Sequence, residues 1–201
     1  MKTPDKNIQQ NSSFFNRGAK RYDNFLLQFW MRRFHTPTLQ ELHLNQSTNI
    51  LDISCGTGEL LKTLQGKAEL YGIDISEEML TVARKKLEPK VHLQKADVHN
   101  LPFQDHFFDY VITTEAFHHY YNQPKALQEM IRITKNGGKV IVTDINFFLK
   151  PIHWLFETFE PGCVKVNSKK EMKRLFQQAG LQNIRQKRNF GFAVMTVGEK
   201  S

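Results

Sequence analysis

The chain has 201 residues and a net charge of +8, from 28 Lys and Arg against 20 Asp and Glu. Its 40% hydrophobic and 24% charged residues are typical of a globular protein, and the length fits one domain spanning residues 1–201. Its apolar runs, such as residues 192–195, are far too short to span a bilayer, and polar residues 1–10 lack the apolar core of a secretory signal. We therefore expect a cytoplasmic protein without a transmembrane segment.

The cysteine count and the distribution of basic residues limit the kinds of metal site, disulfide and charged surface that the protein can have. Two cysteines are too few for a disulfide scaffold or a Cys-rich zinc site, so we expect reduced thiols and no metal. The Lys and Arg residues occur in small groups, and no run reaches five. A solvated basic surface is typical of this spacing, and it leaves open a peripheral contact with anionic surfaces.

The first elements are an N-terminal tail and a helical lid. We expect residues 1–13 to be disordered and residues 14–45, which are dense in aromatics, to form the lid. Beyond them, short apolar runs alternate with helical patterns, which predicts parallel β-α-β units. The predicted strands are 49–53, 70–73, 91–95, 108–113 and 139–143, and the predicted helices are one from Gly58, 76–87 with Ser76 as its N-cap, and 123–134.

The C-terminal part follows a different pattern. Asn136-Gly137-Gly138 predicts a turn, and residues 146–167 are an insertion that we expect to act as a second lid. Ser168 and Glu171 match a capping box, which predicts a helix that stops at Gly180. Two β-like runs follow and predict an antiparallel hairpin at one sheet edge, at 183–187 and 193–197.

A glycine-rich turn after the first strand predicts a ligand site. Gly56 and Gly58 allow close backbone approach at the carboxyl end of a parallel strand, where α/β sheets bind ligands. A dinucleotide fingerprint needs a third glycine where this chain has Leu61, and no Walker phosphate loop is present. Asp52 and Glu59 make the turn acidic, which favours a ligand that carries an ammonium or sulfonium group.

Two further carboxylates follow the next predicted strands. Asp74 closes the second strand, where a carboxylate can accept both ribose hydroxyls of an adenosine. Asp97 ends the third strand and could accept the exocyclic amine of adenine, with the Val98 backbone beside the ring. The ordered set of carboxylates and glycines therefore indicates an adenosyl ligand.

Several ordered motifs resemble the class I S-adenosylmethionine-dependent methyltransferases. Leu-Asp-Ile-Ser-Cys-Gly-Thr-Gly at 51–58 resembles their first motif, Gly-Ile-Asp-Ile-Ser at 72–76 their second, and Ala-Asp-Val at 96–98 with Leu-Pro-Phe at 101–103 their third. Lys-Asn-Gly-Gly-Lys at 135–139 resembles the loop before their fifth strand. Within the class, the chain is most similar to the small-molecule methyltransferases of ubiquinone and menaquinone biosynthesis, which Arg21-Tyr22-Asp23 and Asn189-Phe190-Gly191 also resemble.

The resemblance implies the fold, the cofactor and its contacts. The implied fold is a Rossmann-like, doubly wound, mostly parallel seven-stranded sheet with an antiparallel C-terminal hairpin and an N-terminal helical lid. The implied cofactor is S-adenosyl-L-methionine. Ser54 stands where the family usually has glycine. The implied cofactor-binding residues are Tyr22, Asp52, Ser54, Gly56, Gly58, Asp74, Ile75, Met79, Asp97, Val98 and Glu115.

The catalytic candidates follow the fourth predicted strand. A sulfonium methyl is already activated, so the enzyme mainly aligns the acceptor, but a phenol, acidic carbon or protonated amine also needs a base. His118 and His119 are the catalytic candidates, beside Tyr120 and Tyr121, and Glu115 is expected to contact the cofactor through its backbone. Adjacent histidines do not converge on a metal ion as two histidines one helical turn apart do.

The aromatic segments at 14–34 and 147–159 point to the acceptor. If they roof the cofactor, the acceptor is a small hydrophobic or aromatic molecule, and no stable nucleic-acid partner is expected. Two alternatives stay open. The charge of +8 suits a nucleic-acid methyltransferase, although the chain lacks an appended RNA-binding module and an Asn/Asp-Pro-Pro-Tyr/Phe motif. A non-catalytic regulatory protein would bind the same cofactor. The sequence does not indicate the oligomeric state.

Overall fold

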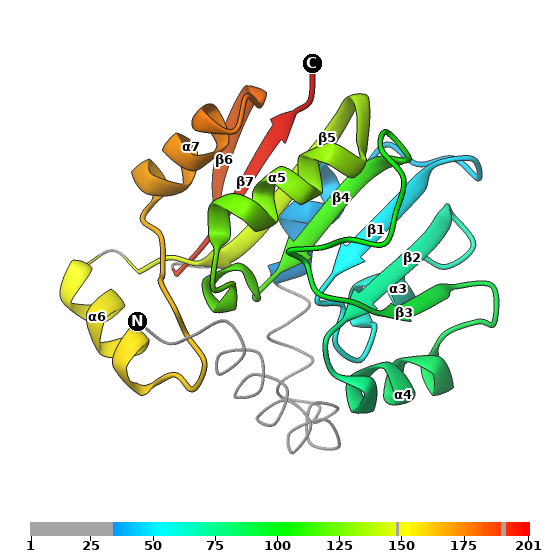
Figure 1. Ribbon diagram of the computed structural model, residues 1–201, viewed down its shortest axis with the longest axis horizontal. Helices are drawn as coiled ribbons and strands as arrows, with labels where there is room; N and C mark the ends of the chain where they lie inside the picture. Colours follow the sequence, from blue (N-terminus) through cyan, green and yellow to red (C-terminus); the bar gives the residue numbers. More distant parts are fainter. Residues whose placement is uncertain (1–33, 148, 190–191) are drawn as a thin grey trace.

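A seven-stranded sheet runs through the middle of the molecule (Figure 1). The computed structural model describes residues 34–147, 149–189 and 192–201, so the expected tail at 1–13 and most of the expected lid at 14–45 lie outside the described residues. The strands, in their order across the sheet, are β3 (His92–Lys95), β2 (Glu69–Asp74), β1 (Asn49–Ile53), β4 (Phe108–Thr114), β5 (Thr134–Ile145), β7 (Ala193–Glu199) and β6 (Gln182–Asn189).

The strand directions confirm the predicted fold class. Strands β1 to β5 pair in parallel, whereas β7 is antiparallel to both β5 and β6. The sheet is therefore mostly parallel and doubly wound, with an antiparallel C-terminal hairpin. The chain builds β2 and β3 on one side of β1 and then returns to place β4 and β5 on the other. This reversal opens a crevice at the carboxyl ends of β1 and β4, where such sheets bind ligands.

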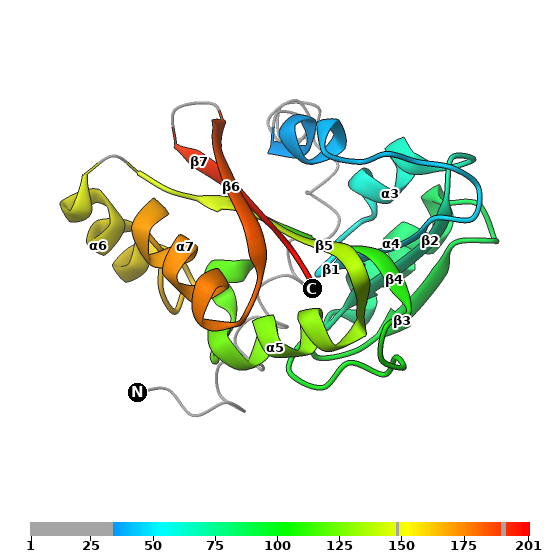
Figure 2. The same ribbon diagram turned by 90° about the horizontal axis from the view of Figure 1, so that it is seen from above.

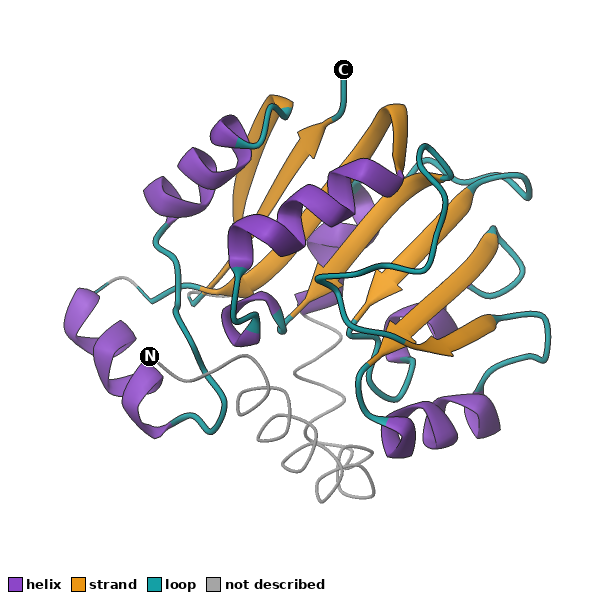
Figure 3. Cartoon of the chain, viewed as in Figure 1, coloured by secondary structure: helices purple, strands orange, loops and turns teal. Residues whose placement is uncertain are grey.

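Helices cover both faces of the sheet (Figures 2 and 3). Within β1, Ile50 belongs to the hydrophobic core on one face of the sheet, whereas Leu51 and Ile53 belong to the core on the other face. None of the described helices is long and apolar enough to cross a membrane. One layer comprises α3 (Glu59–Leu64), α4 (Glu77–Lys86) and helical residues 34–40, and the other comprises α5 (Gln123–Ile133) and α7 (Lys169–Gln178).

The residues predicted to cap helices α4 and α7 form the expected hydrogen bonds. The Ser76 hydroxyl accepts from the Met79 N–H at 3.1 Å and starts α4. Ser168 and Glu171 form both bonds of a capping box and start α7. Gly180, with φ +87°, follows the end of α7 in the left-handed conformation that glycine adopts without strain.

The turn predicted at Asn136-Gly137-Gly138 is wrong, because these residues lie inside β5. The strand starts at Thr134, and its register with β4 shifts next to these glycines. Gly137 has φ +76°, its N–H donates to the Lys200 carbonyl at 2.7 Å, and the Lys200 N–H donates to the Gly138 carbonyl at 2.9 Å. A glycine with positive φ occurs in some bulges as well as in several types of turn, so the sequence pattern did not distinguish them.

Candidate active site

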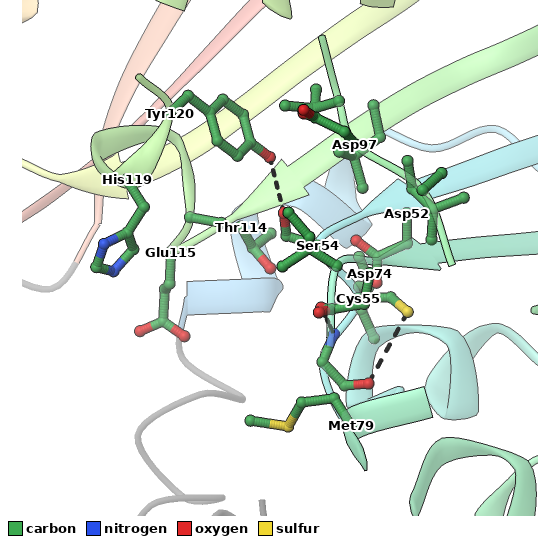
Figure 4. Close-up of a pocket in the computed structure, with 18 of the residues that line it drawn as sticks. Asp52, Ser54, Cys55, Asp74, Met79, Asp97, Thr114, Glu115, His119 and Tyr120 are labelled. Carbon is green, nitrogen blue, oxygen red and sulfur yellow. Dashed lines mark hydrogen bonds between the residues drawn. The ribbon is translucent and has the colours of Figure 1, made fainter. Parts of the chain in front are cut away.

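An open pocket lies at the carboxyl ends of the central strands, and its empty space together with adjoining solvent is about 1040 Å³ (Figure 4). The turns after β1, β2 and β4 line it, together with residues that follow β3. These turns meet there because the strand order reverses between β1 and β4.

The glycine-rich turn supplies the floor of the pocket. Gly56 has φ +52° and donates its N–H to Asp74 Oδ2 at 2.9 Å, which ties the turn after β1 to the end of β2. Gly58 has φ +80° and is not among the lining residues. A Cβ on Gly58 would lie 2.8 Å from Leu87 Cδ1, so this glycine lets α3 begin close against the end of α4.

Ser54 takes part in a hydroxyl network. Its φ is +59°, a conformation that favours glycine, which explains why glycine is usual at this position. Its Oγ lies 3.1 Å from the Tyr120 hydroxyl (Figure 4). That hydroxyl lies 2.9 Å from Thr113 Oγ1. The serine side chain therefore links the turn after β1 to the segment after β4.

Two carboxylates lie side by side beneath the turn. Asp74 Oδ1 accepts from the Ser76 N–H at 2.8 Å, in addition to the bond from Gly56, and its remaining lone pairs can accept from a ligand. Asp52 is buried, and among the described residues its Oδ1 has no hydrogen-bond partner. Burial, and then the charge of Asp74, raise the pKa of Asp52. A cation bound in the pocket would offset the repulsion between the negative charges of Asp52 and Asp74.

The third carboxylate, Asp97, belongs to a small aromatic platform. Its Oδ1 lies 2.6 Å from His99 Nδ1, and its Oδ2 accepts from the Tyr121 hydroxyl at 3.1 Å. The rings of His99 and Tyr121 stack with centroids 3.6 Å apart. Burial opposes ionisation of Asp97, but the hydrogen bonds from His99 outweigh it and hold its pKa below the ordinary value. A flat, polar-edged surface of this kind suits a planar base.

Glu115 lies at the opposite side of the pocket. It follows β4 with φ +56°, and its N–H donates to the Thr143 carbonyl at 2.8 Å, so that N–H is already used within the protein. Burial, and then the nearby charge of Asp144, raise the pKa of Glu115 to about 7. Its side chain lies beside His119 (Figure 4). This carboxyl can therefore change its charge near neutral pH.

The two adjacent histidines occupy different places. His119 lines the pocket, and burial lowers its pKa to about 3, so it is neutral at neutral pH. His118 is buried and is not among the lining residues, and its Nδ1 lies 2.6 Å from Asp144 Oδ1. Although burial opposes it, Asp144 raises the pKa of His118. His118 therefore forms a buried pair under the site.

The sequence-predicted residues meet in this pocket with three exceptions. Gly58 and His118 do not line it, and Tyr22 lies outside the described residues. His35 and Thr57 line the pocket and were missed. Thr57 sits inside the glycine motif, where only its position hinted at a role, and nothing in the sequence marked His35. The predicted residues that line the pocket are Asp52, Ser54, Gly56, Asp74, Ile75, Met79, Asp97, Val98, Glu115 and His119.

The expected aromatic roof from residues 147–159 does not form over the pocket in the described part of that segment. None of its described residues lines the cavity. Trp154 and Phe159 are instead 67% and 74% exposed. In the described part of the chain as a whole, no group of three or more His, Cys, Asp or Glu residues could hold a metal ion.

Comparisons with known proteins agree with this geometry. Residues 51–142 match the family model described as a methyltransferase domain. The chain is 30% identical to the demethylmenaquinone methyltransferase of Staphylococcus aureus strain JH9, over 96% of this chain and 94% of that protein. Two solved structures have the same fold. A SAM-dependent methyltransferase of Thermotoga maritima matches with a TM-score of 0.75, 22% identity, and coverage of 93% of this chain and 98% of that one. Phosphoethanolamine N-methyltransferase 2 of Haemonchus contortus, in complex with S-adenosylhomocysteine and phosphomonomethylethanolamine, matches with a TM-score of 0.76, 15% identity, and coverage of 96% and 59%.

Proposed function

The chain belongs to the class I S-adenosylmethionine-dependent methyltransferases of the quinone-biosynthesis type, and we propose that its acceptor is a small hydrophobic molecule of the quinone class. The demethylmenaquinone methyltransferase that it resembles along nearly its whole length supports this acceptor class. The structural observation that carries the proposal is the pocket with anchoring carboxylates on one side and a carboxyl of pKa about 7 on the other.

The residues of the pocket fit S-adenosylmethionine. Asp52 Oδ1 and the buried Thr57 Oγ1 have no hydrogen-bond partner in the described part of the chain, and a charged, hydrogen-bonding ligand would satisfy both atoms. We assign the ribose hydroxyls to Asp74 and the adenine to Asp97 and Val98, beside the stacked pair described above. When bound, the cofactor supplies a methyl group that its positive sulfur has already activated.

Glu115 is the base that we assign to the reaction. A quinol-type acceptor loses a proton when its carbon or oxygen takes the methyl group, and a base works best when its pKa is near the working pH. The Glu115 carboxyl, with a pKa of about 7, meets this condition. His119, with a pKa of about 3, is too weak a base and instead orients the acceptor as a neutral hydrogen-bonding partner. His118 acts only through its neighbours.

Label transfer tests the acceptor. The full chain is incubated with methyl-labelled S-adenosylmethionine and, in parallel, a demethylated quinol, total lipid extract and total RNA. We expect label in the quinol and in the organic fraction. Label in RNA together with salt-sensitive RNA binding would establish the nucleic-acid enzyme instead. Cofactor binding by calorimetry with no label in any fraction would indicate a non-catalytic regulatory protein.

A further inference from the structure

Helix α6 (Lys150–Phe159) turns an apolar stripe to the solvent. Leu149, which precedes it, is 60% exposed, and Ile152, Leu155 and Phe159 are 41%, 49% and 74% exposed. Their spacing of three, three and four residues places them along one side of the helix. A surface helix usually presents polar residues to water and buries its apolar side. Trp154 adds a further exposed aromatic ring, about 100° around the helix from Leu155.

The stripe is not what attaches α6 to the protein. The adjoining side of the helix makes that contact: the Phe156 ring lies 5.4 Å from the Phe147 ring and 5.8 Å from the His118 ring. His153 Nε2 lies 2.9 Å from the Phe147 carbonyl oxygen. The helix is therefore held in place while its apolar stripe stays available.

Exposed basic side chains follow α6 on the next helix of the chain. Helix α7 is on the same side of the molecule as α6 in both views (Figures 1 and 2), and Lys169, Lys170, Lys173 and Arg174 are all exposed. Residues 150–174 contain six Lys and Arg against three Glu. The acidic residues are partly engaged, since Glu171 pairs with Lys165 at 3.0 Å and Glu157 accepts from the Val166 N–H, while Glu160 ends α6.

We propose that the α6 stripe docks on the surface of an anionic lipid bilayer. An apolar helix side with an exposed Trp and Phe, flanked by Lys and Arg, is the pattern of a helix that lies in the interface plane. The apolar side chains enter the boundary between headgroups and acyl chains, and the α7 cations bind the negative headgroups. The net charge of +8 adds long-range attraction to such a surface.

The docking surface connects directly to the active site. The N–H groups of Val164 and Lys165, which follow α6, both point to the His118 carbonyl, at 2.8 and 3.2 Å. The neighbouring residue, His119, lines the pocket on the Glu115 side. A bilayer held against α6 therefore lies close to the acceptor side of the pocket. This last step rests on the proposed function, because it explains how a lipid-soluble acceptor would reach the site.

Vesicle sedimentation of the full chain tests the docking. We use phosphatidylglycerol/phosphatidylcholine vesicles and pure phosphatidylcholine vesicles, at low and physiological salt. We expect binding to the anionic vesicles that weakens with salt, and a loss of at least about tenfold in the Leu155→Asp/Phe159→Asp variant. The matched control is Thr63→Asp/Thr81→Asp, which makes the same charge change at exposed positions on α3 and α4 and should bind like the parent.

Depth-dependent quenching identifies the residues that enter the bilayer. In a Trp30→Phe background, Trp154 emission should shift to the blue with anionic vesicles and be quenched by brominated lipid. Equal vesicle binding by the Leu155→Asp/Phe159→Asp variant would overturn the proposal. So would a dimer that this variant abolishes, which would assign the stripe to a second copy, or an emission that is already blue before vesicles are added. Calorimetry with S-adenosylhomocysteine on each variant separates this failure from a failure of the proposed function.

Discussion

Two carboxyl groups on opposite sides of the pocket, Asp97 and Glu115, are held in opposite ways, although burial also raises the pKa of Asp52 and of Asp74. On the cofactor side, hydrogen bonds from His99 hold the pKa of Asp97 below its ordinary value even though burial opposes them, so this carboxylate stays charged. On the acceptor side, burial and Asp144 raise the pKa of Glu115 to about 7. A group that must anchor a ligand needs a constant charge, whereas a group that moves a proton needs a variable one. In the mechanism that we propose, the same residue chemistry serves binding on one side and proton transfer on the other.

The largest expected effect is on the acceptor side. Glu115→Gln keeps the shape of the side chain but cannot take a proton, so we expect kcat to fall by about 10²-fold or more. The affinity for S-adenosylhomocysteine should change by less than about threefold. In the parent, kcat should rise with pH through about 7 and then level off, because Glu115 must be ionised. A parent-like kcat in the variant would show that the acceptor needs no base from this residue.

On the cofactor side, the change should appear in binding. Asp74→Ala removes the acceptor of the Gly56 and Ser76 N–H groups as well as the assigned ribose contact, so we expect cofactor binding to weaken by about 1–3 kcal/mol. Asp97→Ala should cost less, because the Val98 backbone stays in place. Calorimetry with S-adenosylhomocysteine measures both. If Asp74→Ala binds like the parent, the ribose assignment is wrong.

The pH dependence of stability sharpens the same contrast. Since the native state holds the Glu115 proton up to about pH 7 while the unfolded chain releases it near 4.5, the stability of the parent should fall as pH rises between these values. Above about pH 7 the loss is constant. Glu115→Gln lacks this loss, so its Tm relative to the parent should be higher at pH 8 than at pH 5. A difference in Tm that does not vary with pH would contradict the assigned pKa.

The smallest expected effect is a change in stability at Ser54, which links the turn after β1 to Tyr120 after β4. Ser54→Gly removes the left-handed strain but also the bond to Tyr120, so we expect a net change in stability within about 1 kcal/mol. Ser54→Ala keeps the strain and loses the bond, and should be the less stable of the two by about 1 kcal/mol. Thermal unfolding of the pair measures the difference. Equal stabilities would mean that the φ of +59° carries no cost here.

The cofactor side could be predicted from the sequence because its residues sit in short motifs. Asp52, Gly56 and Asp74 act through the turns that directly follow β1 and β2, so strand spacing alone brought them together. The acceptor side depends on pairs that are far apart along the chain. His118 meets Asp144, 26 positions away, and only the packing of the sheet reveals that this turns His118 from the pocket.

Elsewhere, the sequence shows which residue types are present but not what surrounds them in the fold. The aromatic residues of 147–159 are evident in the sequence, but their pattern does not distinguish a side chain that roofs a pocket from one that faces solvent, such as Trp154 at 67% exposure. The glycines of the β5 bulge show the same ambiguity. His35 reaches the pocket through the fold alone.

The position of β7 has a consequence for how the chain is made. This strand lies between β5 and β6, yet it is synthesised after both. Until residues 193–199 leave the ribosome, β5 has an open edge of unpaired N–H and carbonyl groups, and β6 has no strand to join. We therefore expect the nascent chain to expose, late in translation, an unpaired strand edge that can pair with other chains. At that stage the parallel strands and the glycine-rich turn are already available to fold.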